Sequence, residues 1–323
     1  MPNKLYLECY SGISGDMTVA ALLDLGADQQ VLLEGLESLN LPGYQLKIGR
    51  VKKNGIDACD FDVILDEPEH HHDHDHEHHH EHDHEHHHDH EHEHHHDHEH
   101  EHHHDHDHEH HHEHDHEHDH EHHHDHDHEH HHDHDHEHHH DHDHEHHHHH
   151  DHEHRNIGDI FAIIDQSKIS DRAKQTAKDI FRIIAAAESK AHGIAEDQVH
   201  FHEVGAVDSI VDIVSAAICL DNLDITEAVV SDLYEGCGYV HCQHGLMPVP
   251  VPAVVNIATD NALRLRLTQT RGEMITPTGA AIAAYLSKGG KLPESFVIEK
   301  IGLGAGKKDF ATANILRAFL IRD

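Results

Sequence analysis

One stretch of this sequence cannot take part in a hydrophobic core. Residues 70–154 contain only histidine, aspartate and glutamate: 54 of the chain's 59 His and 31 of its 64 acidic residues. A segment without apolar side chains has nothing to bury, so burial cannot offset the conformational entropy that folding removes. The tract is therefore predicted to be a long disordered loop between residues 1–69 and 155–323.

The same tract is predicted to bind divalent metal ions. Imidazole suits nickel, zinc, copper and cobalt, and closely spaced His can supply several nitrogens to one ion. The interleaved acids concentrate cations, whereas protons compete with the metal as the pH falls below about 6.5. A purification tag or solubilising spacer is the alternative, but tags are terminal and consist of His alone. The candidate ligands are clustered His: His70, His71, His72, His78, His79, His80, His102, His103, His104, His122, His123, His124, His146, His147, His148, His149 and His150.

The sequence on either side of the tract has the composition of a globular protein. Hydrophobic residues make up 35% of the whole chain although the tract has none, which is enough for a sizeable core. Acidic residues outnumber Lys and Arg there, so we expect no nucleic-acid partner. Five scattered Cys without a C-x-x-C pair indicate reduced thiols, and no stretch approaches the roughly 20 apolar residues that span a bilayer. We expect a cytoplasmic protein that does not enter a membrane.

Apolar periodicity predicts an α/β fold, with a mixed α+β arrangement as the alternative. Helices are expected up to Gly26 and at 28–40, 156–166, 170–191, 206–222 and 277–287, a hairpin at 44–52 and 56–65, and strands at 4–10, 227–234, 263–268, 295–302 and 313–321. Residues 1–69 are too few for a substantial core of their own. We therefore expect residues 1–69 and 155–323 to form one domain that the tract interrupts.

A cluster of possible metal ligands stands just before and within the helix expected at 206–222. His200, His202 and Glu203 are followed by Asp208 and Asp212, which share one helix face because they are four residues apart. Nitrogen and oxygen ligands of this kind can hold a divalent ion. Alternatively, Asp208 flanks the helix start and the His are ordinary loop residues.

Two turns precede expected helices and are candidate anion sites. In the first, Gly12, Gly15 and Asp16 lie in SGISGD between a strand and a helix, where backbone N–H groups can receive an anion and Asp16 can carry a metal or cap the helix. In the second, Thr276 and Thr278 open a helix with Pro in its first turn. Helix capping alone is the alternative for both.

A glycine-rich segment near the end suggests a nucleotide-binding turn but fails the usual tests. Gly302, Gly304, Gly306 and Lys307 lie in IGLGAGKK, where Ile301 replaces the first glycine of a P-loop and Lys replaces its final Ser or Thr. A loop rather than a helix is expected to follow, which excludes the dinucleotide fingerprint. An anion-binding turn with Lys307 is the remaining interpretation, and a nickel-dependent GTPase is disfavoured.

Five segments, in this order, resemble the LarC family of nickel-insertion proteins. They are YLECYSGISGDMTVAALLDLG, HFHEVGAVDSIVDIV, GYVHCQHGLMPVPVPA, GEMITPTGAAIAAYL and GLGAGKKDFATANILR, and they flank the tract on both sides. The resemblance implies that the protein inserts nickel into pyridinium-3,5-bisthiocarboxylic acid mononucleotide, forming the nickel-pincer cofactor of lactate racemase. It also implies a nickel chelatase of the lyase class that depends on CTP and on Mg²⁺ or Mn²⁺.

The chain departs from that family most clearly at its end. Longer members continue into a C-terminal domain associated with CTP, whereas this sequence ends at Asp323. We expect a first-part product, a truncated sequence or one half of a two-chain enzyme with a separate C-terminal half, and the resemblance locates no CTP site here. Smaller departures are Cys237 and Val251, where the family pattern has smaller residues.

The residues suggest a division of labour for this chemistry. Glu203, Asp208 and Asp16 are the candidate catalytic residues, which would position the metal or take the proton that leaves the pyridinium ring. His200, His202 and Asp212 are candidate nickel ligands in addition to the tract. The glycine and threonine turns, with Lys307, would hold the cofactor precursor. The competing function is nickel storage or a metallochaperone without catalytic activity.

Overall fold

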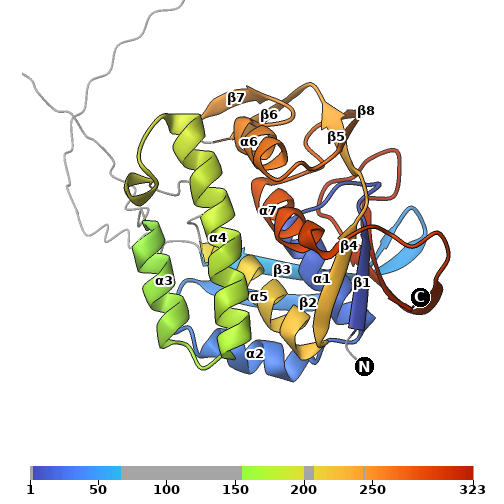
Figure 1. Cartoon of the computed structure of the whole chain (residues 1–323), viewed down its shortest axis with the longest axis horizontal. Coiled ribbons are helices and arrows are strands. Elements are labelled where there is room, and N and C mark those ends of the chain that lie inside the picture. Colours follow the sequence, from blue (N-terminus) through green and yellow to red (C-terminus); the bar gives the residue numbers. More distant parts are fainter. Residues whose placement is uncertain (1–2, 67–154, 200–206, 243, 323) are drawn as a thin grey trace, which may run out of the picture. The chain divides into compact units, whose positions relative to one another are not determined.

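The computed structural model describes residues 3–66, 155–199, 207–242 and 244–322. These parts belong to one compact unit, formed by Met1–Glu69 and His150–Asp323. Its helices are α1 (Gly15–Leu25), α2 (Gln29–Glu37), α3 (Ile157–Gln166), α4 (Asp171–His192), α5 (Val207–Asn222), α6 (Pro252–Asp260) and α7 (Pro277–Leu286). Its strands are β1 (Asn3–Glu8), β2 (Tyr44–Lys53), β3 (Ile56–Leu65), β4 (Ile225–Val230), β5 (Leu233–Cys237), β6 (Tyr239–Cys242), β7 (Gly245–Pro248), β8 (Leu265–Arg271), β9 (Val297–Ala305) and β10 (Ile315–Arg322). The predicted α/β class with mixed strands is confirmed (Figure 1).

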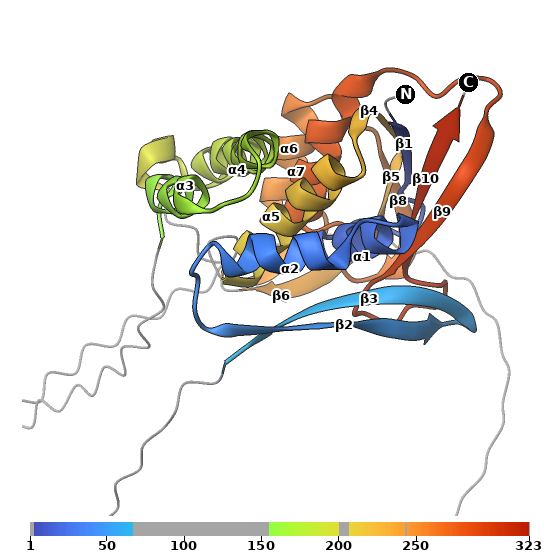
Figure 2. The same ribbon diagram turned by 90° about the horizontal axis from the view of Figure 1, so that it is seen from below.

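The main sheet has six strands in the order β2-β3-β9-β10-β1-β4. β1 pairs with β4 in parallel, and β10 pairs antiparallel with both β1 and β9. The β2–β3 hairpin joins the rest through the single residue pair Cys59 and Gly304. Figure 2 accordingly shows the hairpin running beneath α1 and α2, at a steep angle to β9 and β10.

Helix α1 fills the corner that this bent sheet creates. Its buried residues include Val19, Ala20, Leu22 and Leu25, and α5 and α7 pack against its other side. The sequence explains where the helix stops, because Gly26 adopts a left-handed conformation with a φ of 115°. The start of α1 lies at the opposite end of the helix from Gly26, near the starts of α5 and α7.

Several local predictions are confirmed. The hairpin turns at Asn54 and Gly55, which have φ values of 50° and 85°, as a two-residue turn of this type requires. Helices α3 and α4 begin at the side-chain caps Asn156 and Ser170.

Other predictions are corrected. The strand expected at 227–234 is two strands, β4 and β5, which lie in different sheets. Helix α6 has no counterpart among the predicted helices: it follows a segment with prolines at 248, 250 and 252, which begins at the end of β7, and Pro252 lies in its first turn. β9 extends to Ala305, so Gly302 and Gly304 lie in a strand and not in a turn.

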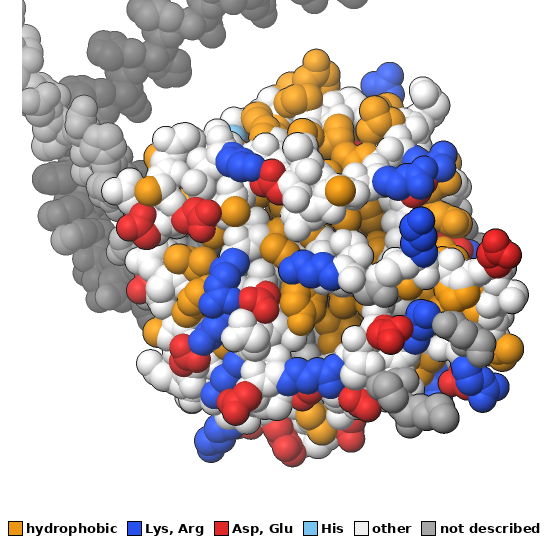
Figure 3. Space-filling model, in the orientation of Figure 1, with side chains coloured by type: hydrophobic (Ala, Val, Ile, Leu, Met, Phe, Trp, Pro, Cys, Tyr) orange, Lys and Arg blue, Asp and Glu red, His pale blue; other side chains and the backbone are white. Residues whose placement is uncertain are grey.

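The face shown in Figure 3 carries mixed charge, with apolar side chains gathered over β6 and β7. Tyr239 and Leu246 are 67% and 56% exposed there. Along α4, basic side chains pair with acids, as Lys178 does with Asp165. In the part of the chain described, no helix is long and apolar enough to cross a bilayer.

Candidate functional site

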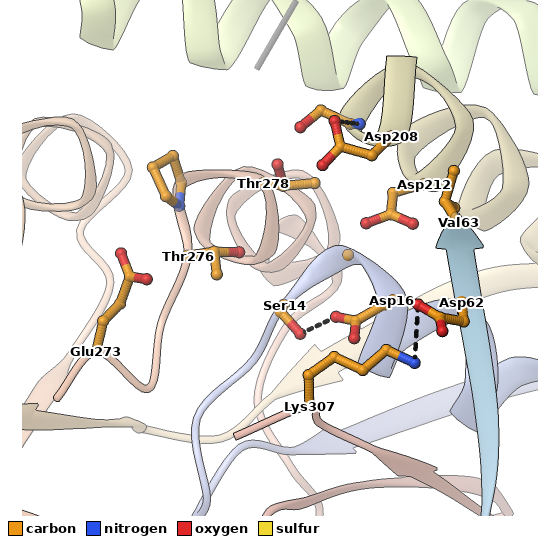
Figure 4. Close-up of a pocket in the computed structure, with 13 residues that line it drawn as sticks. Ser14, Asp16, Asp62, Val63, Asp208, Asp212, Glu273, Thr276, Thr278 and Lys307 are labelled. Carbon is orange, nitrogen blue, oxygen red and sulfur yellow. Dashed lines mark hydrogen bonds and ion pairs between the residues drawn. The ribbon is translucent and has the colours of Figure 1, made fainter. Parts of the chain in front are cut away.

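The first turns of three helices meet at one cavity of about 340 Å³. Ser14, Gly15 and Asp16 come from the start of α1, Asp208 and Asp212 from α5, and Thr276 and Thr278 from α7. Figure 4 shows these side chains around a common space, with Lys307 entering from the opposite side. Each helix start carries a partial positive charge, so the cavity combines three such ends with several carboxylates.

Backbone pairing brings α1 and α7 side by side. The Ile13 N–H donates to the Met274 carbonyl at 3.0 Å, and the Thr276 N–H donates to the Ile13 carbonyl at 3.1 Å. Gly279 packs so closely that an added Cβ would lie 2.1 Å from the Ile13 oxygen. The two helix starts are therefore held in a fixed relation by main chain, independently of the side chains in the cavity.

Helix α5 meets α1 with equally little space. A Cβ at Gly15 would lie 2.4 Å from Asp212 Oδ2, so only glycine allows this carboxylate to reach the start of α1. The backbone N–H of Asp16 favours the charged form of Asp212, and that of Met17 favours the charged form of Asp16. The start of α1 is therefore already engaged by carboxylates.

The start of α7 has a different environment. Thr276 Oγ1 accepts from the Gly279 N–H at 3.1 Å, and the first helical residue is Pro277, which has no N–H. The N–H and hydroxyl of Thr278 stand next to it, and Thr278 lines the cavity. This side of the cavity is better suited to an external anion than the start of α1.

Burial raises the pKa of all three carboxyls on the other side. For Asp212 the pKa is well above its usual range, because burial is reinforced by Asp16 and Asp208 and only partly opposed by Lys307. Burial also raises the pKa of Asp16, although the hydrogen bond from the Ser14 hydroxyl lowers it in part. It raises the pKa of Asp208 as well, although the hydrogen bond from the Ser209 N–H lowers it in part. Among the described residues, Asp212 Oδ1 is buried and has no hydrogen-bond partner. A bound cation would supply the missing partner and stabilise the ionised forms.

The described side chains alone do not form a complete set of metal ligands. In the ranges that the structure covers, no group of three His, Cys, Asp or Glu stands at metal-ligand spacing. The carboxylates of Asp16, Asp208 and Asp212 can supply oxygen ligands, which nickel accepts along with nitrogen. Further ligands would come from elsewhere, including the substrate itself.

Lysines from the end of β9 form the remaining walls. Lys307 Nζ lies 2.7 Å from Asp60 Oδ1 and 3.2 Å from Asp62 Oδ1, both on β3. Burial lowers the pKa of Lys307, but these two carboxylates more than offset it and leave the pKa raised. Lys308 Nζ lies 3.1 Å from Glu273 Oε2. A second cavity of about 160 Å³ shares Ser14, Asp16, Glu273, Thr276 and Lys307 with the first and adds Gly306 and Lys308.

The structure brings together most of the described residues that the sequence singled out. Seven of them line the main cavity: Gly15, Asp16, Asp208, Asp212, Thr276, Thr278 and Lys307. Gly12 lies behind it, where an added Cβ would be 2.0 Å from the Met274 oxygen. Glu203, His200, His202 and the His of the 70–154 tract lie outside the described residues.

Gly302 and Gly304 are not part of this cavity. A Cβ at Gly302 would lie 2.1 Å from the Ala21 oxygen, and one at Gly304 would lie 2.0 Å from the Met17 oxygen. The expectation of a glycine-rich turn here is therefore corrected, because both residues let α1 pack directly on β9. Of the segment's candidates, Lys307 lines the main cavity and Gly306 the smaller one.

Sequence reasoning missed Ser14, Asp62 and Glu273 as lining residues. Asp60 and Asp62 alternate along the strand predicted at 56–65, and acids on one face of a strand are a recognisable signal. Nothing in the local sequence places that face against Lys307, which is more than two hundred residues away.

This α/β protein has partly buried carboxylates on one side of a cavity and the start of α7 on the other, groups of the kinds that suit a cation and an anion. The family model for nickel insertion proteins matches residues 5–323, so the chain belongs to this family. The expected family is thus confirmed.

Named relatives agree. The chain is 52% identical to the pyridinium-3,5-bisthiocarboxylic acid mononucleotide nickel insertion protein of Alkaliphilus metalliredigens, over 100% of this chain and 61% of the relative. It is 41% identical to the protein of the same name from Clostridium acetobutylicum, over 98% of this chain and 63% of the relative. The chain thus spans about three fifths of the length of these relatives. No solved structure matches it.

Proposed function

We propose that this chain takes part in inserting Ni²⁺ into pyridinium-3,5-bisthiocarboxylic acid mononucleotide. The observation that carries the proposal is the cavity itself, where the starts of α1, α5 and α7 meet three partly buried carboxyls. The relatives' names supply the identity of the substrate.

The two sides of the cavity have different roles in this proposal. The mononucleotide phosphate binds at the start of α7, where Thr276 and Thr278 offer hydroxyls, Thr278 an N–H, and Lys307 a positive charge. Nickel binds on the opposite side, beside Asp212, whose Oδ1 has no partner among the described residues, and its further ligands come from the substrate or from residues outside the described part. Because the start of α1 is already engaged by carboxylates, the turn at Gly12 to Asp16 is the less suitable phosphate site.

The reaction exchanges one C–H bond of the pyridinium ring for one Ni–C bond, while the two thiocarboxylates form Ni–S bonds. The ring proton must leave, and a carboxylate beside the metal is a suitable acceptor. Asp208 and Asp16 are the described candidates for this role, and Glu203 is a further one. The raised pKa values of Asp16 and Asp208 favour proton uptake relative to an ordinary carboxylate.

Other parts of the proposal come from the family resemblance or from the sequence alone. The His of the 70–154 tract, with His200 and His202, gather nickel and pass it to the cavity. The reaction uses CTP and Mg²⁺ or Mn²⁺, belongs to the lyase class and takes place in the cytoplasm. A separate C-terminal half completes the enzyme, and lactate racemase or a relative receives the product.

Nickel insertion by carboxylate variants tests the proposal. Asp208→Asn and Asp212→Asn should each lower kcat/KM by at least about 100-fold, as loss of a proton acceptor or metal ligand does. Asp221→Asn is the matched control, because Asp221 lies on the same helix about 20 Å from Asp208. The assay is run with and without the unmatched two fifths of the Alkaliphilus relative, and product is followed by mass and absorbance.

The outcomes separate the alternatives. Activity that falls in both cavity variants but not in the control supports insertion at this cavity. Equal activity in all of them would exclude the cavity as the site. Tight nickel binding without insertion under any combination would favour storage or a metallochaperone.

A further inference from the structure

A buried glutamate outside the cavity has no role in the function proposed above. Glu235 lies on β5 and its side chain is completely buried, with 0% exposure. Its Oε1 accepts three backbone hydrogen bonds: from Gly236 at 2.7 Å, Met274 at 2.7 Å and Ile275 at 3.2 Å. Among the described residues, its Oε2 is buried without a partner.

Such an arrangement is costly for stability. Burial raises the pKa of Glu235, and the N–H groups of Met274, Gly236 and Ile275 offset this only in part while the charge of Glu273 adds to it. A buried carboxylate with one oxygen unpaired destabilises a fold relative to an apolar residue of the same size. Its presence therefore needs an explanation beyond stability.

The groups that Glu235 binds are those that align the two helix starts. The N–H groups of Met274 and Ile275 donate to the Glu235 carboxylate. The Met274 carbonyl accepts from the Ile13 N–H, and the Thr276 N–H donates to the Ile13 carbonyl. Ile13 leads directly into α1, and Thr276 caps α7. One carboxylate thus links β5 to the entry of both helices.

The contact between β5 and this segment is close as well as polar. The Gly272 N–H donates to the Cys237 carbonyl at 3.0 Å, and a Cβ at Gly236 would lie 1.9 Å from the Gly272 oxygen. The segment 272–276 therefore has little freedom to find another position once Glu235 holds it. It carries both Glu273 and Thr276, which line the cavity.

We propose that Glu235 is a positioning residue that fixes segment 274–276, and through it the start of α7 against α1. Its hydrogen bonds reach the segment before α7, on the phosphate side of the cavity, and none of those described reaches the carboxylates of α5. The identity of the phosphate ligand rests on the proposed function. The positioning itself does not.

Three substitutions of Glu235 test this. Glu235→Leu keeps the volume and removes the acceptor, Glu235→Asp withdraws the carboxylate by one methylene, and Glu235→Gln keeps one acceptor oxygen in place. Thr176→Val is the control, because it deletes a largely buried hydrogen bond to Tyr285 at the opposite end of α7 from Thr276. Each variant is compared with the wild type by amide hydrogen exchange and by insertion kinetics.

The two readouts answer different questions. In Glu235→Leu, and less strongly in Glu235→Asp, the amides of Ile13, Met274, Ile275 and Thr276 should exchange at least about tenfold faster, the change that loss of about 1.4 kcal/mol of local stability produces. The KM for the mononucleotide should rise by a similar factor while the KM for nickel changes less than about threefold. Glu235→Gln should stay close to the wild type in both, and Thr176→Val should alter neither.

Wild-type exchange at these amides in both Glu235→Leu and Glu235→Asp would overturn the proposal. So would equal rises in the two KM values, since a general loss of structure affects both sides of the cavity. If the wild type itself performs no insertion, the proposed function fails, and the exchange measurement still decides whether Glu235 positions the segment. If Glu235→Leu does not fold, Glu235→Asp decides.

Discussion

At the scale of single residues, the cavity depends on charges that the fold disfavours. Asp212 places a carboxylate against the start of α1, where Oδ1 finds no partner among the described residues. Sequence could predict that Asp208 and Asp212 share a helix face, because that follows from a spacing of four. It could not predict that Asp16 meets them, because that contact depends on how α1 and α5 pack.

The stability cost of Asp212 leads to a prediction with a definite pH dependence. Its pKa is raised on folding, so between the ordinary value near 3.8 and the raised value the folded state binds a proton that the unfolded chain has lost. Folding therefore becomes less favourable as the pH rises through this window. Asp212→Asn removes the cost and should raise Tm at pH 7 by roughly 2–4 °C, the effect of about 1 kcal/mol in a domain of this size.

Thermal unfolding of Asp212→Asn and wild type from pH 3.5 to 8 tests this. The advantage of the variant should be smallest at the acidic end and grow with pH. A variant that is less stable than the wild type at pH 7, or whose gain in Tm does not change with pH, would contradict the conclusion that burial raises the pKa of Asp212 at a cost in stability.

At the level of helices and strands, turn residues correctly predicted the hairpin and the helix ends. The glycines in β9, in contrast, led to the wrong prediction of a turn. The Asn-Gly pair at 54–55 acts locally, so its sequence is sufficient. Gly302 and Gly304 have a role only in relation to α1, which is distant in the sequence, and so they suggested a turn. The prolines at 248–252 likewise gave no prediction of α6. Pro breaks a helix in its interior but suits its first turn, and only the structure shows that Pro252 begins one.

Close packing of α1 on β9 predicts the effect of Gly304→Ala. The added Cβ would lie 2.0 Å from the Met17 oxygen, so α1 must shift, and such overpacking costs about 1–3 kcal/mol. Gly49→Ala on β2 is the control, because its Cβ would meet no described atom within 4 Å. Denaturant unfolding should show the loss for Gly304→Ala only, and equal stability of the two variants would show that α1 does not pack as described.

At the scale of the whole molecule, composition predicts the division between a globular domain and the tract at 70–154. The segments 1–69 and 150–323 contact one another as one unit, although the tract separates them by more than eighty residues in the sequence. The metal-binding role of the tract stays a prediction, as does the need for a partner that supplies the rest of the relatives' length.

Replacing residues 70–154 by a short Gly-Ser linker tests this division. We expect the Tm of the folded unit to change by no more than about 2 °C, because the tract has no apolar side chains to contribute to the core. Nickel bound per chain at pH 7.5 should fall several-fold, and the steep loss of binding below about pH 6.5 should disappear with the tract's His. Calorimetry and equilibrium dialysis measure the two effects, and a large loss of Tm would contradict the division.

In the proposed function, the mononucleotide binds where α1, α5 and α7 begin. A crystal structure of the chain with the mononucleotide and nickel would show where both are bound. We expect the phosphate within hydrogen-bond distance of the Thr278 N–H and Lys307 Nζ, with nickel beside Asp212. A phosphate bound elsewhere, with this cavity holding only water, would contradict it.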